Sequence, residues 1–326
     1  MKPSATQPAK LPTTAPSKAV ALLLAQAAQA SSQQSKHKPH TKPGSAPSKH
    51  EVRPEQSIEL LKALHILTRD GAMNQDSRRK LKQVYHLFNF IEPLLLKAQQ
   101  AHEDLCVVDH GAGKSYLGFI LYDLFFKLRA PQGKMVGVET RDELVTRSQA
   151  LAHEFGFTGM AFLNLSVAQS ETSAQLPKRI DIVTALHACN TATDDAIAFG
   201  IVHQVQHMVI VPCCQAEVAA TLKADKPKTL AHNPMAELWR HPLHTREFGS
   251  QLTNVLRCLQ LESHGYQVTV TELVGWEHSM KNELIIATRG DARGAVPARK
   301  SAERLTQVLS QLGLDAMRPR FFTPLL

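Results

Sequence analysis

The chain has 326 residues and 43% of them are hydrophobic, enough for one large domain or two small ones with a substantial core. No apolar run approaches the roughly 18 residues that a membrane-spanning helix requires, so we expect no membrane segment. Five cysteines scattered over a chain of this size do not resemble the framework of a small disulfide-rich secreted protein. We therefore expect a reducing, cytoplasmic compartment.

Most of the formal net charge of +8 lies at the N-terminus. Residues 1–53 contain eight Lys and Arg but only one acid, Glu51, which gives +7 and leaves the rest of the chain close to neutral. The same residues are rich in Pro, Ser, Thr, Ala, Gln and Lys, so we expect a disordered basic tail. Two interpretations stay open: a solubilising tail, or a tether to an anionic partner through salt-sensitive contacts.

Residues 54–100 predict two N-terminal helices. An apolar stripe with helical spacing begins near Gln56 and ends before Gly71. A second and longer helix is expected from about Asp76 to Gln99, with one apolar side. Its start is basic, with Arg78, Arg79, Lys80 and Lys82.

Residues 101–290 alternate short apolar runs with helical segments. This order predicts an α/β domain with a mostly parallel sheet and helices on both faces. The last two strands are joined by a short loop, so we expect an antiparallel pair at one edge. A helical insert occupies residues 216–265, and residues 291–326 predict a C-terminal helix and an apolar tail. The expected strands cover residues 105–109, 135–139, 160–165, 180–186, 208–211, 267–274 and 284–288.

The first predicted strand ends in the glycine-rich turn Asp109-His110-Gly111-Ala112-Gly113-Lys114-Ser115. A P-loop would need a glycine where Val108 stands, and a dinucleotide fingerprint would need one where Tyr116 stands. The third interpretation is the acidic-x-Gly-x-Gly turn of methyltransferases that use S-adenosylmethionine. In such a turn the acid accepts from the cofactor's ammonium, and the glycines make room for its methionine part. This interpretation assigns cofactor binding to Asp109, Gly111, Ala112 and Gly113.

The ends of the second and third strands bear on the same site. Glu139 ends the second strand and can accept hydrogen bonds from both ribose hydroxyls, because a carboxylate offers two acceptor oxygens. The alternative is an exposed charge at a strand end. After the third strand, many methyltransferases have an acid that binds the adenine amino group, but this chain has Ser166 there. We expect the Ser166 hydroxyl, or a backbone group, to serve instead.

Three further segments carry a family resemblance. They are Leu186-His187-Ala188-Cys189 after the fourth strand, Pro212-Cys213-Cys214-Gln215 after the fifth, and Glu277-His278-Ser279-Met280-Lys281-Asn282 before the last. With these segments, residues from about 78 to 290 resemble the Rossmann-like, class I methyltransferases that use S-adenosylmethionine. The resemblance implies a seven-stranded Rossmann-like sheet with that cofactor at the carboxyl ends of its strands.

Candidate catalytic residues follow the fourth and fifth strands. His187 is the best candidate base because histidine titrates near neutral pH, but it could instead orient the cofactor or cap a helix. Asp194 is a second candidate, and either it or Thr193 could simply be the N-cap of the next helix. His278 and Asn282 could border the acceptor pocket, with a plain surface hairpin as the alternative.

The cysteine pair has three interpretations. Cys213 and Cys214 could be a buried structural pair, since free cysteine is often buried. They could also join His187 and Cys189 in a metal site, although the usual C-x₂₋₄-C spacing of zinc ligands is missing. Finally, Cys214 or its neighbour could be a nucleophile for pyrimidine methylation. We predict no bound metal.

The sequence therefore predicts a methyltransferase dependent on S-adenosylmethionine, with RNA, either rRNA or tRNA, as the expected substrate. The basic tail and the helical insert, where residues 239–248 are dense in Arg, His and aromatic side chains, are the expected RNA contacts. The near-neutral remainder also permits a protein or small-molecule acceptor. A non-catalytic scaffold protein that keeps the cofactor pocket is an alternative of a different class.

Overall fold

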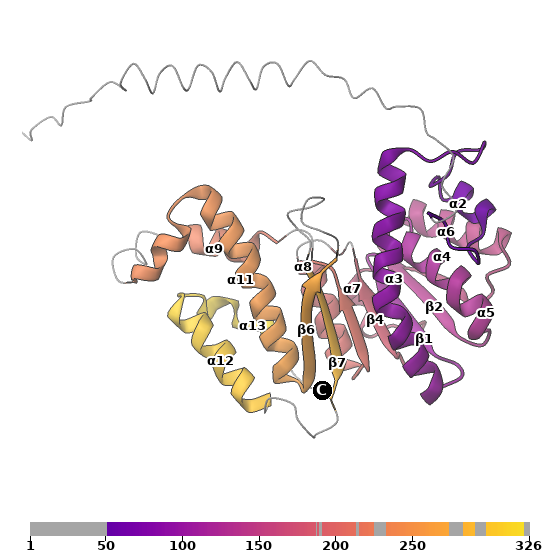
Figure 1. The fold of residues 1–326 in the computed structure, drawn as a ribbon. Coiled ribbons are helices and arrows are strands. Elements are labelled where there is room, and N and C mark those ends of the chain that lie inside the picture. Colours follow the sequence, from indigo (N-terminus) through magenta and orange to yellow (C-terminus); the bar gives the residue numbers. More distant parts are fainter. Residues whose placement is uncertain are drawn as a thin grey trace, which may run out of the picture. The chain divides into compact units, whose positions relative to one another are not determined.

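A single seven-stranded sheet organises the protein in the computed structural model, which describes residues 51–186, 188, 191–212, 215–224, 233–273, 283–290 and 298–322. The strand order is β3-β2-β1-β4-β5-β7-β6 (Figure 1). The first five strands are parallel, and β7 is antiparallel to both β5 and β6. This confirms the predicted fold class. The strands are β1 Cys106–His110, β2 Lys134–Glu139, β3 Met160–Asn164, β4 Ile182–Ala185, β5 His207–Ile210, β6 Tyr266–Glu272 and β7 Glu283–Arg289.

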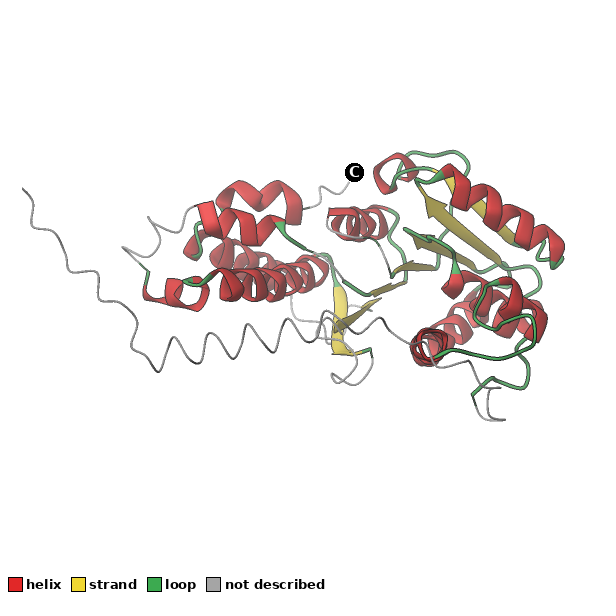
Figure 2. Ribbon diagram, turned by 90° about the horizontal axis from the view of Figure 1, so that it is seen from above, coloured by secondary structure: helices red, strands yellow, loops and turns green. Residues whose placement is uncertain are grey.

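Helices cover both faces of the sheet because its central strands are apolar on both sides (Figure 2). In β1, Val107 faces one core while Cys106 and Val108 face the other, as the alternation of side chains along a strand requires. The first face is covered by α2 Ile58–Ala63, α3 Gln75–Ala101, α4 Tyr116–Leu121 and α6 Asp142–Glu154. The second is covered by α7 Val167–Ser170, α8 Thr191–Val202 and the end of α11 Pro242–Ser263.

Helix α3 brings its basic start to the edge of the sheet where the parallel strands end (Figure 1). Asn74 is its N-cap, and the Asn74 side chain accepts a hydrogen bond from the Ser77 amide. The Lys80 Nζ lies 6.0 Å from the ring centre of Tyr116, the first residue of α4 after β1. Lys80, one of the predicted basic residues, therefore lies beside the start of the helix that follows this turn.

Two helices differ in form from the sequence prediction. The expected helix near Gln56–Gly71 is only six residues long, since it ends before His65, which has a φ of 57°. The apolar residues 117–128 after the glycine turn also predict one helix, which the structure divides into α4, the π-helix η1 Tyr122–Phe126 and α5 Lys127–Arg129. The π turn carries buried Asp123, whose Oδ2 accepts from the Ser57 amide at 2.7 Å. That contact joins the segment before α2 to the sheet domain.

A helical lobe packs beyond β6, and we use this name for α9 Glu217–Ala224, η2 Pro234–Trp239, α11, α12 Ala298–Gln311, η3 Asp315–Met317 and α13 Arg318–Phe321 (Figure 1). The insert and the C-terminal segment were predicted as separate pieces, but they share one core. Its buried residues are Val218, Leu222, Ala236, Trp239, Leu252, Leu256, Leu259, Leu305, Leu309, Leu314, Met317 and Phe321.

The end of the predicted tail contacts α3. The Arg53 guanidinium lies 4.4 Å from the ring centre of Phe88, and Glu51 forms an ion pair with Arg78. Residues 1–50 lie outside the described part of the chain. Within the part that is described, no helix is both long and apolar enough to cross a membrane.

Candidate active site

The turn after β1 is held against β2 by its own backbone. The amides of Gly111 and Ala112 both donate to the Val138 carbonyl, at 2.9 and 3.1 Å. Gly111 has a φ of +67°, a backbone conformation that residues other than glycine rarely adopt. A Cβ at Gly111 would lie 3.1 Å from the Cα and N of Ala188. Glycine is therefore required here both by conformation and by the close approach of the segment after β4.

Gly113 links the turn to the end of β2 and leaves space on its other side. Its amide donates to Glu139 Oε2 at 2.8 Å. Gly113 has a φ of +59°, and a Cβ built there would meet only an Arg141 nitrogen at 3.7 Å and the Gly111 carbonyl oxygen at 3.9 Å. Because the nearest group is the end of a flexible side chain, a ligand can approach this backbone closely.

Glu139 is paired with Arg141 in the ligand-free site. Arg141 Nε donates to Glu139 Oε1 at 3.0 Å, and Arg141 NH2 donates to Oε2 at 3.2 Å. Burial disfavours the carboxylate, but the hydrogen bonds from Arg141 and from the Gly113 amide outweigh it and hold the pKa of Glu139 below its usual range. The carboxylate that was predicted to bind ribose hydroxyls is thus ionised, and it already accepts hydrogen bonds from Arg141, which would compete with those hydroxyls.

Asp109 lies buried at the end of β1, next to Thr184 of β4. The two residues are direct partners in the register of these parallel strands, and Thr184 Oγ1 donates to Asp109 Oδ1 at 2.6 Å. Burial raises the pKa of Asp109 to about 7, against the lowering effect of the Thr184 hydrogen bond. A cationic group of a ligand would favour the ionised form, so Asp109 can respond to such a ligand near neutral pH.

These residues fit S-adenosylmethionine with one rearrangement. Asp109 and Glu139 stand at the carboxyl ends of the neighbouring strands β1 and β2, and the glycine turn runs between them. A buried carboxylate suits the cofactor's ammonium, and an ionised carboxylate with two acceptor oxygens suits its ribose hydroxyls. The Arg141 guanidinium must leave Glu139 before those hydroxyls can bind both oxygens.

Ser166 has a structural partner of its own. Its side chain accepts from the Gln169 amide at 3.1 Å, and the Gln169 side chain accepts from the Ser166 amide at 2.9 Å. This reciprocal pair is a capping box at the start of α7, a helix too short to be recognised in the sequence. Ser166 lies two residues beyond Asn164, the register partner of Glu139, so it stands at the same edge of the sheet. Its predicted role towards adenine stays a prediction.

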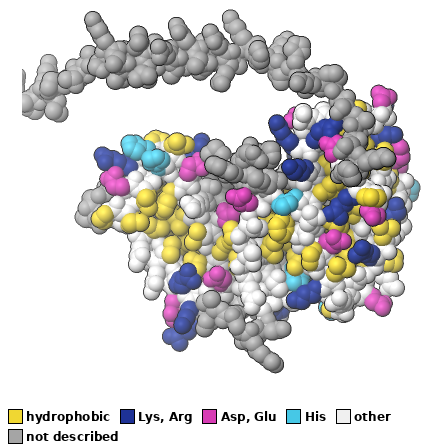
Figure 3. Space-filling model, in the orientation of Figure 1, with side chains coloured by type: hydrophobic (Ala, Val, Ile, Leu, Met, Phe, Trp, Pro, Cys, Tyr) yellow, Lys and Arg dark blue, Asp and Glu magenta, His cyan; other side chains and the backbone are white. Residues whose placement is uncertain are grey.

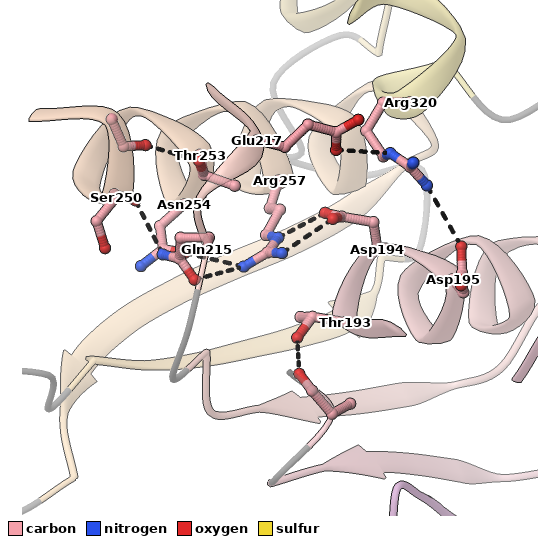
Figure 4. A network of polar contacts seen from close by, with 12 residues as sticks. Thr193, Asp194, Asp195, Gln215, Glu217, Ser250, Thr253, Asn254, Arg257 and Arg320 are labelled. Atoms are coloured by element: carbon pink, nitrogen blue, oxygen red, sulfur yellow. Dashed lines mark hydrogen bonds and ion pairs between the residues drawn. The ribbon is translucent and has the colours of Figure 1, made fainter. Parts of the chain in front are cut away.

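Asp194 belongs to a buried ion pair rather than to a helix cap. Helix α8 begins at Thr191, so Asp194 lies in its first turn, and its carboxylate accepts from Arg257 of α11 at 2.6 and 3.0 Å (Figure 4). Thr193 Oγ1 donates to the Ala188 carbonyl. The alternative in which either residue is the N-cap is therefore wrong, because the helix begins earlier than the sequence pattern indicated.

The remaining candidates on the acceptor side fall on residues that the structure does not describe. They include both cysteines of the pair, so their three interpretations stay open. In the described ranges, no group of three or more His, Cys, Asp and Glu could hold a metal ion. The candidate residues that lie outside the described part of the chain are His187, Cys189, Cys213, Cys214, His278 and Asn282.

Sequence reasoning did not single out four contributors to this site: Thr184, Arg141, Arg257 and His110. Thr184 is a polar residue within an apolar strand, and Arg257 lies among apolar positions of α11, so both carried a weak signal. His110 is fully buried against Phe199, with ring centres 4.6 Å apart. Burial lowers the pKa of His110 to about 3, so its neutral ring is only a weak proton acceptor near pH 7.

A known protein family matches the part of the chain that contains this turn. Residues 79–221 match a family described as a methyltransferase domain. A glutathione S-transferase C-terminal domain-containing protein homolog of Drosophila pseudoobscura pseudoobscura is 22% identical over 261 residues, which are 71% of this chain and 40% of that protein. The chain thus spans less than half the length of this relative.

Solved structures show similarity at a low level. The magnesium protoporphyrin IX methyltransferase of Synechocystis, with bound SAH, is 15% identical with a TM-score of 0.40, over 71% of this chain and 93% of that one. Aeropyrum pernix fibrillarin, with S-adenosyl-L-methionine, is 11% identical with a TM-score of 0.35, over 57% and 66% of the two chains. The sheet order, the turn after β1 and the family match together identify a class I methyltransferase domain in this chain.

Proposed function

We propose that the protein is a methyltransferase that uses S-adenosylmethionine and acts on RNA. The observation that carries the first part is the pair of carboxylates, Asp109 and Glu139, on either side of a glycine turn within a methyltransferase domain. When bound, the cofactor supplies a methyl group on a sulfonium that is already activated for transfer. Asp109 would then accept from its ammonium, and Glu139 would accept from its ribose.

Support for RNA comes from the charge beside the turn. Arg79, Lys80 and Lys82 are exposed at the start of α3, and Lys80 lies near Tyr116 at the start of α4. Figure 3 shows Lys and Arg side chains gathered at this end of α3. S-adenosylmethionine has no phosphate for these cations to bind, whereas an RNA backbone next to the methyl donor would fit them.

A second supporting surface lies on the other side of the turn. A hollow beside α4 is lined by His65, Lys114, Tyr116 and Arg147, among others. Arg147 NH2 and His65 Nε2 are 2.9 Å apart, so two nitrogen-rich side chains from distant segments meet there. Exposed cations therefore stand on both sides of the cofactor turn, with Lys80 on α3 and Arg147 on α6, and this spread favours an extended anion over a small acceptor.

The helical insert supports the RNA proposal less than its composition indicated. Trp239 is fully buried and stacks on Phe248 with ring centres 5.0 Å apart, so this pair belongs to the core of the helical lobe. The exposed His241 and His244 remain as candidate RNA contacts from this region.

Methyl-labelled S-adenosylmethionine tests the proposal directly. The purified protein would be incubated with the labelled cofactor and lysate from a strain that lacks the protein, and the products separated into RNA, protein and small molecules. We expect label in nuclease-sensitive material with the native chain and none with the Gly113→Val variant. Label confined to protein or small molecules would overturn the RNA assignment. Cofactor binding without any transfer would instead favour a scaffold protein.

The tail gives a separate prediction. Residues 1–50 contain seven lysines and no acid. Replacing these seven lysines by glutamine in the full chain removes their positive charge. We expect unchanged affinity for S-adenosylhomocysteine, weaker RNA binding at low salt, and a smaller dependence of RNA affinity on salt, by roughly 0.7 in the logarithmic slope for each lost phosphate contact. Filter binding over a range of salt concentrations measures it. Equal slopes for the two proteins would exclude the tail from RNA binding.

A further inference from the structure

A hollow of about 480 Å³ lies between helix α2, the start of α3 and the end of α6. Its volume is within the range of pockets that hold small ligands. It is separate from the cofactor turn, since neither Asp109 nor Glu139 lines it. The cofactor-binding residues proposed above therefore do not account for this hollow.

Part of the lining is apolar. Ile66 and Leu67 are buried in the segment after α2, and the half-buried Phe155 directly follows α6. Aromatic and aliphatic side chains of this kind offer a surface on which a base can stack. The hollow can therefore hold a flat, partly apolar group.

The start of α3 contributes a wall that is suited to an anion. Asn74 and Ser77 line the hollow, and the Asn74 side chain accepts from the Ser77 amide at 2.8 Å. Within the described part of the chain, the amides of Gln75 and Asp76 have no acceptor. A helix of 27 residues also places partial positive charge at this end, so the wall favours a phosphate group.

The Ser77 side chain is independent evidence for a ligand at this wall. Ser77 is only 8% exposed, yet its hydroxyl has no hydrogen-bond partner among the described residues. A buried hydroxyl without a partner costs free energy, and such groups are rare in native proteins unless a water or a ligand satisfies them. Because Ser77 lines the hollow, a phosphate oxygen bound there can accept from its hydroxyl.

The charged side chains around the hollow suit the two ends of a nucleotide. The exposed Arg69 guanidinium has no ion pair in the ranges that the structure describes, so it is available to a phosphate. Lys62 and Glu59 pair with each other at 2.9 Å. Glu154, at the end of α6, can accept from the amino group of a base. A nucleotide of adenine, guanine or cytosine combines a phosphate, an amino group and a flat ring, as this lining requires.

A second hollow connects this one to the cofactor turn. His65 lines both of them, and the hollow beside α4 is also lined by Lys114 and Arg147. Arg147 NH2 lies 2.9 Å from His65 Nε2, and Lys114 directly follows Gly113 of the turn. An RNA strand that passes the methyl donor can follow these side chains to the larger hollow. This path favours a nucleotide within RNA over a free nucleotide.

We propose that the hollow between α2, α3 and α6 binds one unpaired nucleotide of the RNA acceptor. Its phosphate accepts from Ser77 and Arg69, and its base lies on the apolar part of the lining with Phe155. The base is unpaired because a paired base is held inside its duplex. This inference rests on the proposed function, and it gives the RNA a point of attachment apart from the methyl donor.

Ser77→Ala in the full chain tests the phosphate contact. The hydroxyl has no described partner in the protein and alanine favours helices, so we expect the native melting temperature. Binding of a mixed-sequence, single-stranded RNA oligonucleotide should weaken by about tenfold in fluorescence anisotropy, because a hydrogen bond to a charged group is lost. Affinity for S-adenosylhomocysteine should stay native. An RNA affinity equal to that of the native chain would overturn the proposal.

Arg69→Gln and Arg299→Gln form a matched pair of charge removals. Arg69 lines the hollow, whereas Arg299 lies on α12 of the helical lobe and is almost fully exposed beside Glu303. We expect a severalfold loss of affinity for the single-stranded RNA in Arg69→Gln and native affinity in Arg299→Gln. Equal losses would mean that the RNA responds only to the overall charge of the protein, which contradicts a site at the hollow.

Two further probes identify the ligand. A duplex RNA of the same sequence has no unpaired base, so Ser77→Ala and the native chain should bind it equally. A loss as large as that for the single strand would exclude the base from the site and overturn the proposal. Adenosine monophosphate should displace the single strand only weakly. Displacement at concentrations similar to those of the RNA itself would assign the hollow to a free nucleotide instead.

The labelling reaction separates this inference from the proposed function. For Ser77→Ala we expect a higher KM for RNA with kcat unchanged at saturating RNA, because the lost contact lies away from the methyl donor. Native KM in the Ser77 and Arg69 variants would exclude the hollow and leave the proposed function intact. If the native chain labels no RNA, the proposed function fails, while the binding comparison still decides whether the hollow takes a nucleotide.

Discussion

The carboxyl edge of the sheet has two halves that are built in different ways. On the side of β1 and β2, a short glycine turn and two carboxylates form the site. Apart from the bond from Thr184 to Asp109, its bonds are made by backbone amides or by Arg141, two residues from Glu139. On the side of β4, β5 and β7, one buried arginine gathers side chains from segments far apart in the chain. The first half can be read from local sequence, and the second depends on the packing of α11.

Blocking the glycine turn gives the largest expected effect on the first half. In Gly113→Val, a branched side chain takes the space beside Arg141 and is forced into a left-handed conformation, which costs about 1–2 kcal/mol. We expect no detectable binding of S-adenosylhomocysteine in calorimetry, with the fold retained by circular dichroism. Gly156→Val is the matched control, because Gly156 has a φ of +65° and nothing near its missing Cβ. Native affinity in Gly113→Val would exclude the turn as the cofactor site.

Breaking the buried pair gives the largest effect on the second half. In Asp194→Ala, the Arg257 charge is left buried without its carboxylate, and we expect a loss of about 3–5 kcal/mol in the free energy of unfolding. Arg320→Ala, which breaks only partly exposed pairs, should lose no more than about 1 kcal/mol. Urea denaturation measures both. Similar losses of unfolding free energy in the two variants would mean that the buried pair stabilises the fold no more than the partly exposed pairs do.

Glu139 and Arg141 should change cofactor affinity in opposite directions. Glu139→Gln removes the charge that accepts from the ribose, and we expect a loss of about tenfold in affinity for S-adenosylhomocysteine. Arg141→Met removes the donor that competes for the same carboxylate, so affinity should rise by a few-fold, on the order of 0.5–1 kcal/mol for an ion pair that is partly exposed. Weaker binding in Arg141→Met would show instead that Arg141 helps to hold the cofactor.

Asp109 gives an effect of another kind, a dependence of cofactor affinity on pH. Its pKa of about 7 lies above that of an unfolded chain, so the folded protein holds an extra proton, and the stability it contributes is lost as pH rises from about 4 to about 7. Binding of the cofactor's ammonium favours the carboxylate, so affinity should rise between pH 6 and 8, by up to about tenfold. Calorimetry of the native chain and of Asp109→Asn checks this. The variant cannot titrate and should show a flat profile.

Much of the site on the first half was predictable from residues close in sequence. The run Asp109–Gly113 and the strand-end Glu139 are short local patterns, and the parallel register of β1 and β2 places them side by side. The left-handed backbone at Gly111 and Gly113 explains why glycine stands there. The pairing of Glu139 with Arg141 was not predicted, because the sequence pattern does not reveal which side-chain conformation Arg141 adopts when no ligand is bound.

The sequence by itself determined the fold class and the strands, since the alternation of short apolar runs with amphipathic helices permits few arrangements other than a covered parallel sheet. Tertiary structure alone decided three other features. The insert and the C-terminal helix share one core in the helical lobe, Asp194 pairs with Arg257 instead of capping α8, and Asp109 titrates near neutral pH. All three depend on contacts between residues distant in the chain, because burial and charge pairing arise only when the helices pack.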